Sequence, residues 1–440
     1  MITTLARSIA LLLAAALLSP ISIFAQTLFS DGATIFVDNG GILHCNGGIT
    51  LENGSALTNH GDVRTTKNST FLVPGTFTND VTSSVNGNGM YYVEQDWINS
   101  ATFNGDLSTV ILNGNTEQFI TSTNGTITEF NNLTLLGTGT GNDRKKSLQG
   151  VDARISVTGI LTINNRELAT ETNELLVLNT NTNAITNTQT FGAEGFVSSE
   201  APGYLNWTTN GSSSYLFPVG SSDGSVRYRP VTIRPKSILV DNYRVRLNNT
   251  SGDAYGYFLA QHDEDISTLN ANFFHSIEQV SGLNNADVSL TYLASADGDW
   301  NSMAQWSNGE LQWNSVGTTN TASLGNYATV EKADWDFANP AHPYILVNLN
   351  EEIHIPNVFT PNQDGVNDFY LISAKGITEF NIVIVNRWGN VVFESNDILI
   401  SWDGTSKGEM CQDGVYFYVI QAKSATQEYN KHGHITLNAN

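Results

Sequence analysis

Residues 33–54 read ATIFVDNGGILHCNGGITLENG. Apolar runs at 33–37, 42–45 and 49–51 each end in a corner that contains Asn or Gly, residue types that favour turns. A corner about every seven residues is too frequent for a meander of long hairpins and is typical of the short flat faces of a solenoid coil. The same texture continues along the chain, so we predict a β-solenoid-like region over residues 27–200.

A loose internal repeat supports stacked coils. Similar phrases begin at Leu57, Phe77, Phe103 and Phe130, which lie 20, 26 and 27 positions apart. A coil of this length buries its apolar residues only by stacking on its neighbours, so we expect these four side chains to point inward and stack. Asn residues at successive corners are expected to stack their amides or to cap their own turns. A β-sandwich rich in Asn turns is the alternative for this region.

The composition favours an all-β protein. Acidic residues outnumber basic ones by 42 to 20, and the net charge of −22 argues against nucleic-acid binding. Only 14% of residues are charged while 40% are hydrophobic, which separates this chain from disordered acidic chains and provides for a packed core. The 38 Gly residues, together with many Asn and Thr, exclude a helical bundle because all three are poor helix formers.

The first residues are typical of a secretory signal peptide. Arg7 supplies a positive charge, residues 9–18 form a short apolar run, and Ala25 precedes a plausible cleavage point. We therefore assign residues 1–25 to a signal peptide. No later apolar run approaches the length of a membrane span, so we expect no transmembrane segment after cleavage.

The texture of the chain changes near residue 200. Pro218, Pro230 and Pro235 appear close together and the apolar runs lengthen, so we predict an antiparallel β-sandwich over residues 201–350. Its second half contains Trp300, Trp306, Trp313 and Trp335. These tryptophans either pack in the core or form a platform on which a glycan stacks. Their exposure discriminates between the two readings.

The last part of the chain, residues 351–440, is predicted to be a compact sandwich of its own. The expected strands are 355–359, 368–372, 380–385, 391–393, 415–420 and 434–437. Phe380, Ile382 and Ile384 share one face of their strand because side chains alternate. The strand 415–420 is apolar on both faces, which predicts a central strand covered on both sides.

Four ordered motifs follow one another in this segment. They contain Pro356, Asn357, Phe359, Pro361, Asn362, Asp364, Gly365, Asn367 and Asp368, then Asn386, Arg387, Trp388 and Gly389, then Trp402, Asp403 and Gly404, then Gly414 and Tyr416. The segment 353–437 closely resembles the gliding-motility-associated C-terminal domain, the type B sorting signal of the type IX secretion system in Bacteroidetes. The region ahead of it is loosely similar to secreted β-rich surface proteins of Bacteroidetes.

The resemblance implies export. It implies an Ig-like β-sandwich at the C-terminus, recognition by the type IX secretion machinery and an outer-membrane partner protein, and a final location at the cell surface or in the medium. The turns at 361–368 and 386–390 are the exposed candidates for recognition.

Two of the motifs leave alternatives open. Asn362, Asp364, Asn367 and Asp368 have the oxygen ligands of a calcium loop, but Thr360 stands where a first carboxylate is needed, so side-chain-capped turns compete with calcium. In the second motif, Arg387 either stacks on Trp388 or pairs with a carboxylate, or else the two form an exposed recognition patch.

No catalytic constellation is evident. The nucleophile elbow, the zinc-protease motif, the Walker loop and the dinucleotide fingerprint are all absent from the sequence. His432 and His434 share a strand face but have no evident third metal ligand. Residues 262–265 are an acidic loop, either solvated or a weak cation site. Cys45 and Cys411 are predicted to be two separate thiols.

These observations predict a non-enzymatic exported protein without a cofactor. The favoured function is an adhesin or structural surface protein. The alternatives are a secreted carbohydrate-binding module that stacks glycans on its tryptophans or, ranked below it, a β-helix polysaccharide lyase or hydrolase, which needs paired carboxylates on one strand face.

Overall fold

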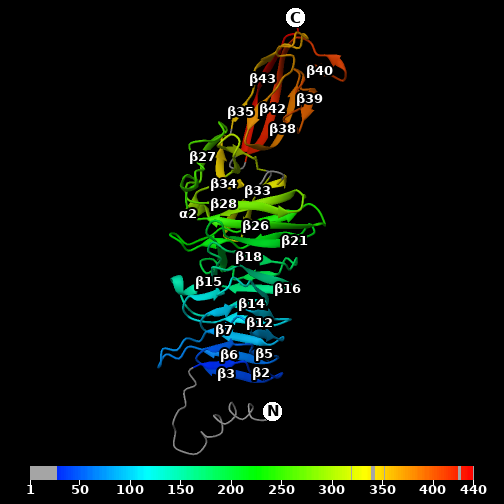
Figure 1. Ribbon diagram of the computed structural model, residues 1–440. Coiled ribbons are helices and arrows are strands. Elements are labelled where there is room, and N and C mark those ends of the chain that lie inside the picture. The colour runs from blue at the N-terminus through cyan, green and yellow to red at the C-terminus, as the bar shows by residue number, and fades with distance from the viewer. Residues whose placement is uncertain (1–26, 319, 338–341, 351, 425–427, 440) are drawn as a thin grey trace, which may run out of the picture. The chain divides into compact units, whose positions relative to one another are not determined.

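A computed structural model gives the fold (Figure 1) and describes residues 27–318, 320–337, 342–350, 352–424 and 428–439. The expected signal peptide lies outside these residues. The described chain is nearly all β, as predicted, and its helical pieces are short: η1 (Gly141–Arg144), η2 (Gly252–Tyr255) and α2 (Ala294–Asp297). The chain divides into two compact units. Unit 1 comprises residues up to 179 with 183–196 and 201–203, and unit 2 comprises 180–182, 197–200 and 204–440.

Unit 1 consists of three parallel sheets, which successive strands join in turn. The first sheet holds β1 (Leu28–Asp31), β4 (Ile49–Glu52), β7 (Phe77–Asn79), β10 (Trp97–Asn99), β13 (Gln118–Thr121), β15 (Lys145–Gln149) and β17 (Glu167–Ala169). The second holds β2 (Thr34–Val37), β5 (Ala56–Asn59), β8 (Ser84–Asn86) and β11 (Thr102–Asn104). The third holds β3 (Ile42–Asn46), β6 (Asp62–Thr66), β9 (Met90–Val93), β12 (Thr109–Leu112), β14 (Thr128–Leu135), β16 (Ala153–Asn164) and β18 (Glu174–Val177), with β19 (Ile185–Asn187) beside β16.

The parallel register places inward side chains of successive turns on one another. On the second sheet Leu57 lies opposite Val85, and Val85 lies opposite Phe103. On the first sheet Phe77 lies opposite Trp97, and the two rings stack with their centroids 4.8 Å apart. Columns of buried side chains therefore connect the turns of unit 1, whose strands form successive layers in Figure 1.

The four repeat residues do not form one column. Leu57 and Phe103 lie on the second sheet, Phe77 on the first and Phe130 on the third. Three of them are fully buried, whereas Phe103 is only half-buried, because β11 is the last strand of its sheet among the described residues. Phe103 still packs against Trp97, with centroids 5.1 Å apart. The four side chains point inward as expected, and the Phe103 and Phe130 rings lie 6.2 Å apart, but their strands belong to three sheets, so the four do not stack in a single column.

Several asparagines at the corners of unit 1, among them Asn59, Asn79 and Asn99, are buried and hydrogen-bonded. The Asn79 side-chain amide donates to Asn99 Oδ1 at 2.8 Å, and that of Asn99 donates to Thr128 Oγ1 at 3.0 Å. Asn59 Oδ1 accepts the Gly61 N–H at 3.0 Å. Both expected uses of corner Asn, contact between amides of successive turns and local capping, occur. Buried amides need such partners because an unpaired one is costly.

Most of unit 2 ahead of the C-terminal segment forms antiparallel sheets. One sheet has the order β21 (Tyr204–Asn210), β26 (Val240–Asn248), β28 (Phe274–Ser281), β34 (His342–Leu349), β30 (Ser302–Ser307) and β31 (Gln312–Ser315), with β27 (Ile266–Leu269) beside β34. Another has the order β22 (Tyr215–Phe217), β25 (Val231–Pro235), β29 (Ala286–Tyr292), β33 (Tyr327–Trp335) and β32 (Asn320–Leu324). The short strands β23 (Gly220–Ser221) and β24 (Arg227–Tyr228) pair with each other, and β20 (Phe196–Ser198) precedes β21.

The tryptophans of this part pack rather than line up on the surface. Trp306 and Trp313 are cross-strand partners in the β30–β31 hairpin and are both buried, with ring centroids 5.5 Å apart and planes at 76°. Trp300 and Trp335 are half-buried, and the Trp335 ring N–H donates to the Tyr344 hydroxyl at 2.6 Å. The four do not form an exposed coplanar row.

The C-terminal segment forms a five-stranded sheet in the order β36 (Val358–Phe359), β43 (Glu428–Leu437), β42 (Gly414–Ser424), β38 (Ile377–Val385) and β39 (Val391–Ser395). Two small pairs accompany it: β35 (Glu352–His354) with β37 (Ser373–Lys375), and β40 (Thr405–Ser406) with β41 (Glu409–Met410). No helix in the described parts of the chain is long and apolar enough to cross a membrane.

Three expectations for this segment were wrong. The expected strand 355–359 is limited to β36, because residues 355–357 do not pair. Residues 368–372 do not form a strand: Tyr370 makes only an isolated bridge to Trp402, and the stretch buries Tyr370 and Ile372 while Phe369 and Leu371 remain exposed. The strand β42 is central, but only one of its faces is covered. Val415, Phe417 and Val419 are 43%, 48% and 53% exposed on the other face.

Candidate functional site

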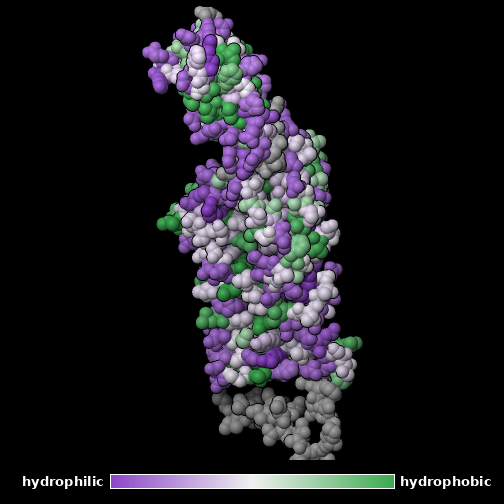
Figure 2. Space-filling view, turned by 180° about the vertical axis from the view of Figure 1, so that it is seen from behind, coloured by the Kyte–Doolittle hydropathy of each residue, from purple (hydrophilic) through white to green (hydrophobic). Residues whose placement is uncertain are grey.

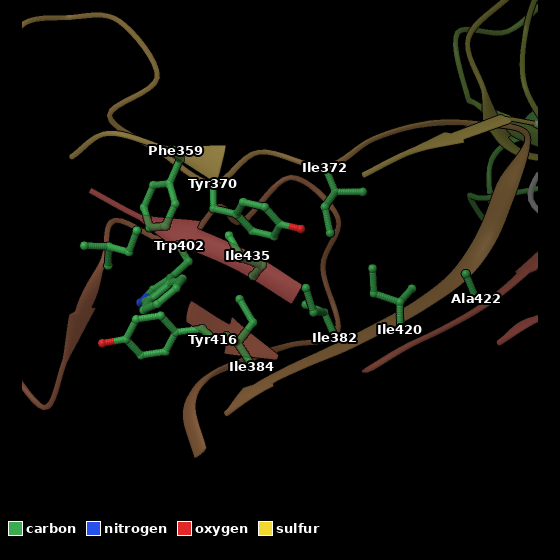
Figure 3. Close-up of a cluster of buried hydrophobic side chains, with 11 residues drawn as sticks. Phe359, Tyr370, Ile372, Ile382, Ile384, Trp402, Tyr416, Ile420, Ala422 and Ile435 are labelled. Atoms are coloured by element: carbon green, nitrogen blue, oxygen red, sulfur yellow. The ribbon is translucent and has the colours of Figure 1, made fainter. Parts of the chain in front are cut away.

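Three aromatic residues of the C-terminal motifs lie in the core of this segment (Figure 3). Phe359, Trp402 and Tyr416 are buried, and the Trp402 ring lies 5.2 Å from each of the other two ring centroids. The Trp402 ring N–H donates to the Thr405 carbonyl at 2.8 Å, and the Tyr370 hydroxyl donates to the Pro356 carbonyl at 2.9 Å. Phe359, Trp402 and Tyr416 therefore hold the domain together and are not available to a partner.

The first motif forms a loop whose side chains bond to its own backbone. Both carboxylate oxygens of Asp368 accept backbone N–H groups, from Gln363 at 2.6 Å and from Gly365 at 2.8 Å. Asp364 Oδ1 accepts the Val366 N–H at 2.8 Å, and the Asn362 amide donates to Asp364 Oδ2 at 3.0 Å. This is the geometry of side-chain-capped turns, in which the oxygens suggested for calcium are already directed at the loop.

Asn367 and Pro361 complete this loop. Asn367 is exposed and adopts a φ of +54°, and its carbonyl accepts the Thr360 N–H at 2.8 Å. Pro361 is buried. The loop is thus closed on itself by local bonds and tied to the core at its start.

The second motif is a tight turn that presents two side chains to solvent. Asn386 Oδ1 accepts the backbone N–H groups of Trp388 and Asn390, both at 3.0 Å, and Gly389 has a φ of +79°, which suits glycine. Trp388 is 81% exposed and Arg387 is also exposed. In the part of the chain that the structure describes, no guanidinium group stacks on the Trp388 ring. The structure therefore separates this motif into a shaping residue, Asn386, and two exposed residues.

The third and fourth motifs are also shaped by local contacts. Asp403 Oδ1 accepts the backbone N–H and the hydroxyl of Thr405, at 2.9 and 2.7 Å. Gly404 has a φ of +83°, which suits glycine, and a Cβ atom there would lie 3.0 Å from Pro361 Cγ. Both the backbone conformation and the close neighbour therefore favour glycine at this position. A guanidinium nitrogen of Arg387 would lie 3.3 Å from a Cβ atom at Gly414. Arg387 thus extends over the beginning of β42.

An open surface runs from this turn along β42. A groove of about 330 Å³ is lined by residues of the Asn386–Trp388 turn together with Met410, Cys411, Val415 and Tyr416. The exposed face of β42 continues from Val415 to Phe417 and Val419. Cross-strand neighbours of Phe417 and Val419 on β38 are Val385 and Val383, which extend the apolar character of the face. In the view of Figure 2, hydrophobic side chains gather on the C-terminal part of the chain.

Comparison with protein-family models accounts for this segment. Residues 353–437 match the CHU_C type IX secretion signal domain. Comparisons with curated proteins and with solved structures find no match. The CHU_C match covers the four motifs, the core of Figure 3 and the open face of β42, and it agrees with the resemblance seen in the sequence.

The type IX secretion signal domain determines where the protein is exported. It directs the chain across the outer membrane to the cell surface or the extracellular space, and it implies contact with the secretion machinery. A sorting domain must present a surface that the machinery can contact. Among the motif residues, Arg387 and Trp388 of the second turn are exposed, as are Asn362, Asp364 and Asn367 of the 361–368 loop. The open face of β42 is exposed as well.

The remaining candidates of the sequence do not gather into a site. His432 and His434 are exposed side by side on β43, and among the described residues no group of three or more His, Cys, Asp or Glu could hold a metal ion. Asp263 turns inward and accepts the Ser315 N–H at 2.8 Å. Cys45 and Cys411 are both free thiols, and burial raises the pKa of each.

The sequence did not reveal the open face of β42. Every residue of the run 415–420 is apolar or aromatic. The two faces of this strand therefore look alike in the sequence, which cannot show that one is covered and the other open. The only available signal was the histidines opposite it: His432 and His434 pair with Val419 and Phe417 and are unusual on a buried sheet face.

Proposed function

We propose that the mature protein is a non-enzymatic adhesin or structural protein of the cell surface, which its type IX secretion signal delivers there. In this proposal unit 1 is a β-solenoid that provides a stalk or binding face, the following antiparallel part is a β-sandwich, and the C-terminal domain is an Ig-like sandwich. The observation that carries the proposal is the in-register parallel stacking of unit 1, because such stacks offer long faces for contact.

The packing of the tryptophans favours this function over glycan stacking. A carbohydrate platform needs aromatic faces that are exposed and coplanar. Trp306 and Trp313 are buried edge to face, and the half-buried Trp335 bonds to Tyr344. A platform of these residues would have to unfold the β30–β31 hairpin.

Cell attachment tests the adhesin function. We compare cells of a type IX host that display the mature chain with cells that lack it, on a glycan array and on whole-cell layers. Increased attachment of the displaying cells is expected. Equal attachment, or release of reducing ends or unsaturated uronides from polysaccharides by the purified protein, would contradict the proposal.

We propose that an outer-membrane partner protein of the secretion machinery binds the sorting domain at its exposed apolar surface, which consists of the 386–390 turn and the open face of β42. Trp388 and Phe417 are the largest exposed side chains of that surface. Trp388→Ala and Phe417→Ser are expected to leave the chain folded and to retain it in the periplasm. Leu399→Ser is the matched control, since Leu399 is 83% exposed but lies outside the turn and β42. Normal surface display of both variants would rule out this surface.

A further inference from the structure

The first turn of unit 1 leaves three strand edges open. β1, β2 and β3 are each the terminal strand of their sheet, and in the described parts of the chain no strand pairs with their outer edge. The Ala33 and Val37 carbonyls accept bonds from the next turn, from the N–H groups of Ala56 at 3.0 Å and His60 at 2.8 Å. In a parallel ladder alternate residues bond to the same neighbour, so the backbone of Phe36 points to the open side.

The other two edges are open in the same way. The Leu28 N–H donates to the Gly48 carbonyl at 2.9 Å, and the Gly41 carbonyl accepts the Asp62 N–H at 2.9 Å. By the same alternation, Phe29 on β1 and Ile42 on β3 direct their backbone groups away from the stack. The end of unit 1 therefore presents unpaired N–H and C=O groups from all three sheets.

This end is also apolar. Phe29, Phe36 and Ile42 are 62%, 62% and 63% exposed. Of the inward side chains of the same turn, Leu28, Ile35 and Leu43 are half-buried, whereas Ser30, Val37 and Cys45 are buried. The register partners of the three half-buried residues one turn further on are Ile49, Leu57 and Val63, and all three are buried. The core of unit 1 thus reaches solvent at its first turn.

Lys and Pro, which commonly protect a free strand edge, are missing here, and the charged side chains of this turn are the exposed Asp31 and Asp38. Free strand edges normally carry Lys or Pro, or a cap with a polar outer face, which prevents pairing with another chain. Residues 27–46 contain no Lys, no Arg and no Pro. The proposal concerns the mature chain from residue 26, because residues 1–25 are the expected signal peptide.

We propose that the first turn is the interface of a homodimer in which a second copy of this chain completes the three sheets. A two-fold axis perpendicular to the stack reverses the direction of each strand. It therefore pairs β2 with β2 of the second copy, and β1 with β3 of the second copy, all antiparallel. The strand lengths fit, since β1 and β2 have four residues and β3 has five.

The same operation is self-complementary in its side chains. A two-fold interface uses one patch on both copies. Inward residues meet inward residues, so Leu28, Ile35 and Leu43 become covered, and the exposed Phe29 and Phe36 lie beside the strands of the second copy. This dimer does not depend on the proposed adhesin function, and it concerns a surface that the sorting domain does not contain.

The oligomeric state of the mature chain, residues 26–440, tests the proposal. We measure its mass by sedimentation equilibrium from about 1 µM to about 100 µM, a range in which mass action separates monomer from dimer. The double variant Phe29→Lys/Phe36→Lys places charges at the interface. Val157→Lys is the matched control, because Val157 is 69% exposed on β16, away from the first turn.

The wild type and Val157→Lys are expected to be dimers, and the double variant is expected to dissociate at least about tenfold more readily. Phe36→Pro removes one outward N–H without adding charge and is expected to weaken the dimer too, since Pro is tolerated at a free edge. Circular dichroism establishes that each variant is folded. A monomeric wild type throughout the range, or a dimer that all first-turn variants leave unchanged, would overturn the proposal.

Discussion

At the scale of single residues, Trp402 and Trp388 show how one motif type serves two purposes. Trp402 is buried among aromatic rings, and Trp388 is 81% exposed. Trp402→Ala is expected to lower the local stability of the sorting domain by roughly 3–5 kcal/mol, because a cavity remains. Trp388→Ala is expected to change it by less than about 0.5 kcal/mol. Native-state hydrogen exchange of the β42 amides measures both, and equal losses for the two variants would contradict the assignment.

His275 provides a residue-scale prediction of pH dependence. Burial lowers its pKa to about 4 from an ordinary value of 6.5, its Nε2 lies 2.9 Å from the Arg229 carbonyl, and its Nδ1 is buried without a hydrogen-bond partner in the described structure. The folded pKa is the lower one, so the unfolded chain binds the proton first. Stability is therefore complete above pH 6.5 and is lost as the pH falls toward 4.

The His275 effect is large enough to measure. The shift corresponds to roughly 3 kcal/mol of unfolding free energy lost between about pH 7 and pH 4. His275→Gln keeps a donor for the Arg229 carbonyl but does not titrate, so its pH dependence should be flatter by that amount. Denaturant titrations of both proteins across this range measure the difference, and parallel curves would show that His275 does not titrate on unfolding.

At the scale of elements, the contact between successive turns of unit 1 depends on glycine. A Cβ atom at Gly159 would lie 1.8 Å from the Asn131 carbonyl oxygen, whereas one at Gly125 would meet nothing within 4 Å. Gly159→Ala should therefore cost about 3 kcal/mol or more, since the backbone of a neighbouring turn must move. Gly125→Ala has only the strain of its positive φ, about 1–2 kcal/mol.

Thermal unfolding and hydrogen exchange of β14 and β16 measure this pair of glycine variants. The expected order is a large loss for Gly159→Ala and a small one for Gly125→Ala. Similar losses would mean that backbone conformation, not the close approach of turns, decides the effect.

At the scale of the whole molecule, we expect that loss of the C-terminal domain abolishes export but leaves the rest of the chain folded. Deletion of residues 353–440 removes the type IX secretion signal domain, so the truncated chain should remain inside the outer membrane. Unit 1 should keep its fold, because its described strands pair only with strands that the truncated chain retains. Protease accessibility on whole cells measures display, and circular dichroism measures folding. Surface display of the truncated chain would contradict the assignment of the signal.

Local chemistry was predictable from the sequence. The corners of Asn and Gly, the capped loop at 361–368 and the turn at Asn386 all follow from residues within a few positions of one another, and the structure places them as turns. The sorting domain was recognisable for the same reason, since its four motifs are mainly turns and core aromatics in a fixed order. Composition likewise predicted a chain that is nearly all β.

Only the tertiary structure decided which residues share a sheet and which faces are covered. It distributed Leu57, Phe77 and Phe130 over three different sheets and left Phe103 half-buried at the last strand of one of them. It also left one face of β42 open. The physical reason is that an apolar alternation fixes two faces of a strand, whereas burial depends on partners distant in the chain. Turn preference is local, but register and coverage are not.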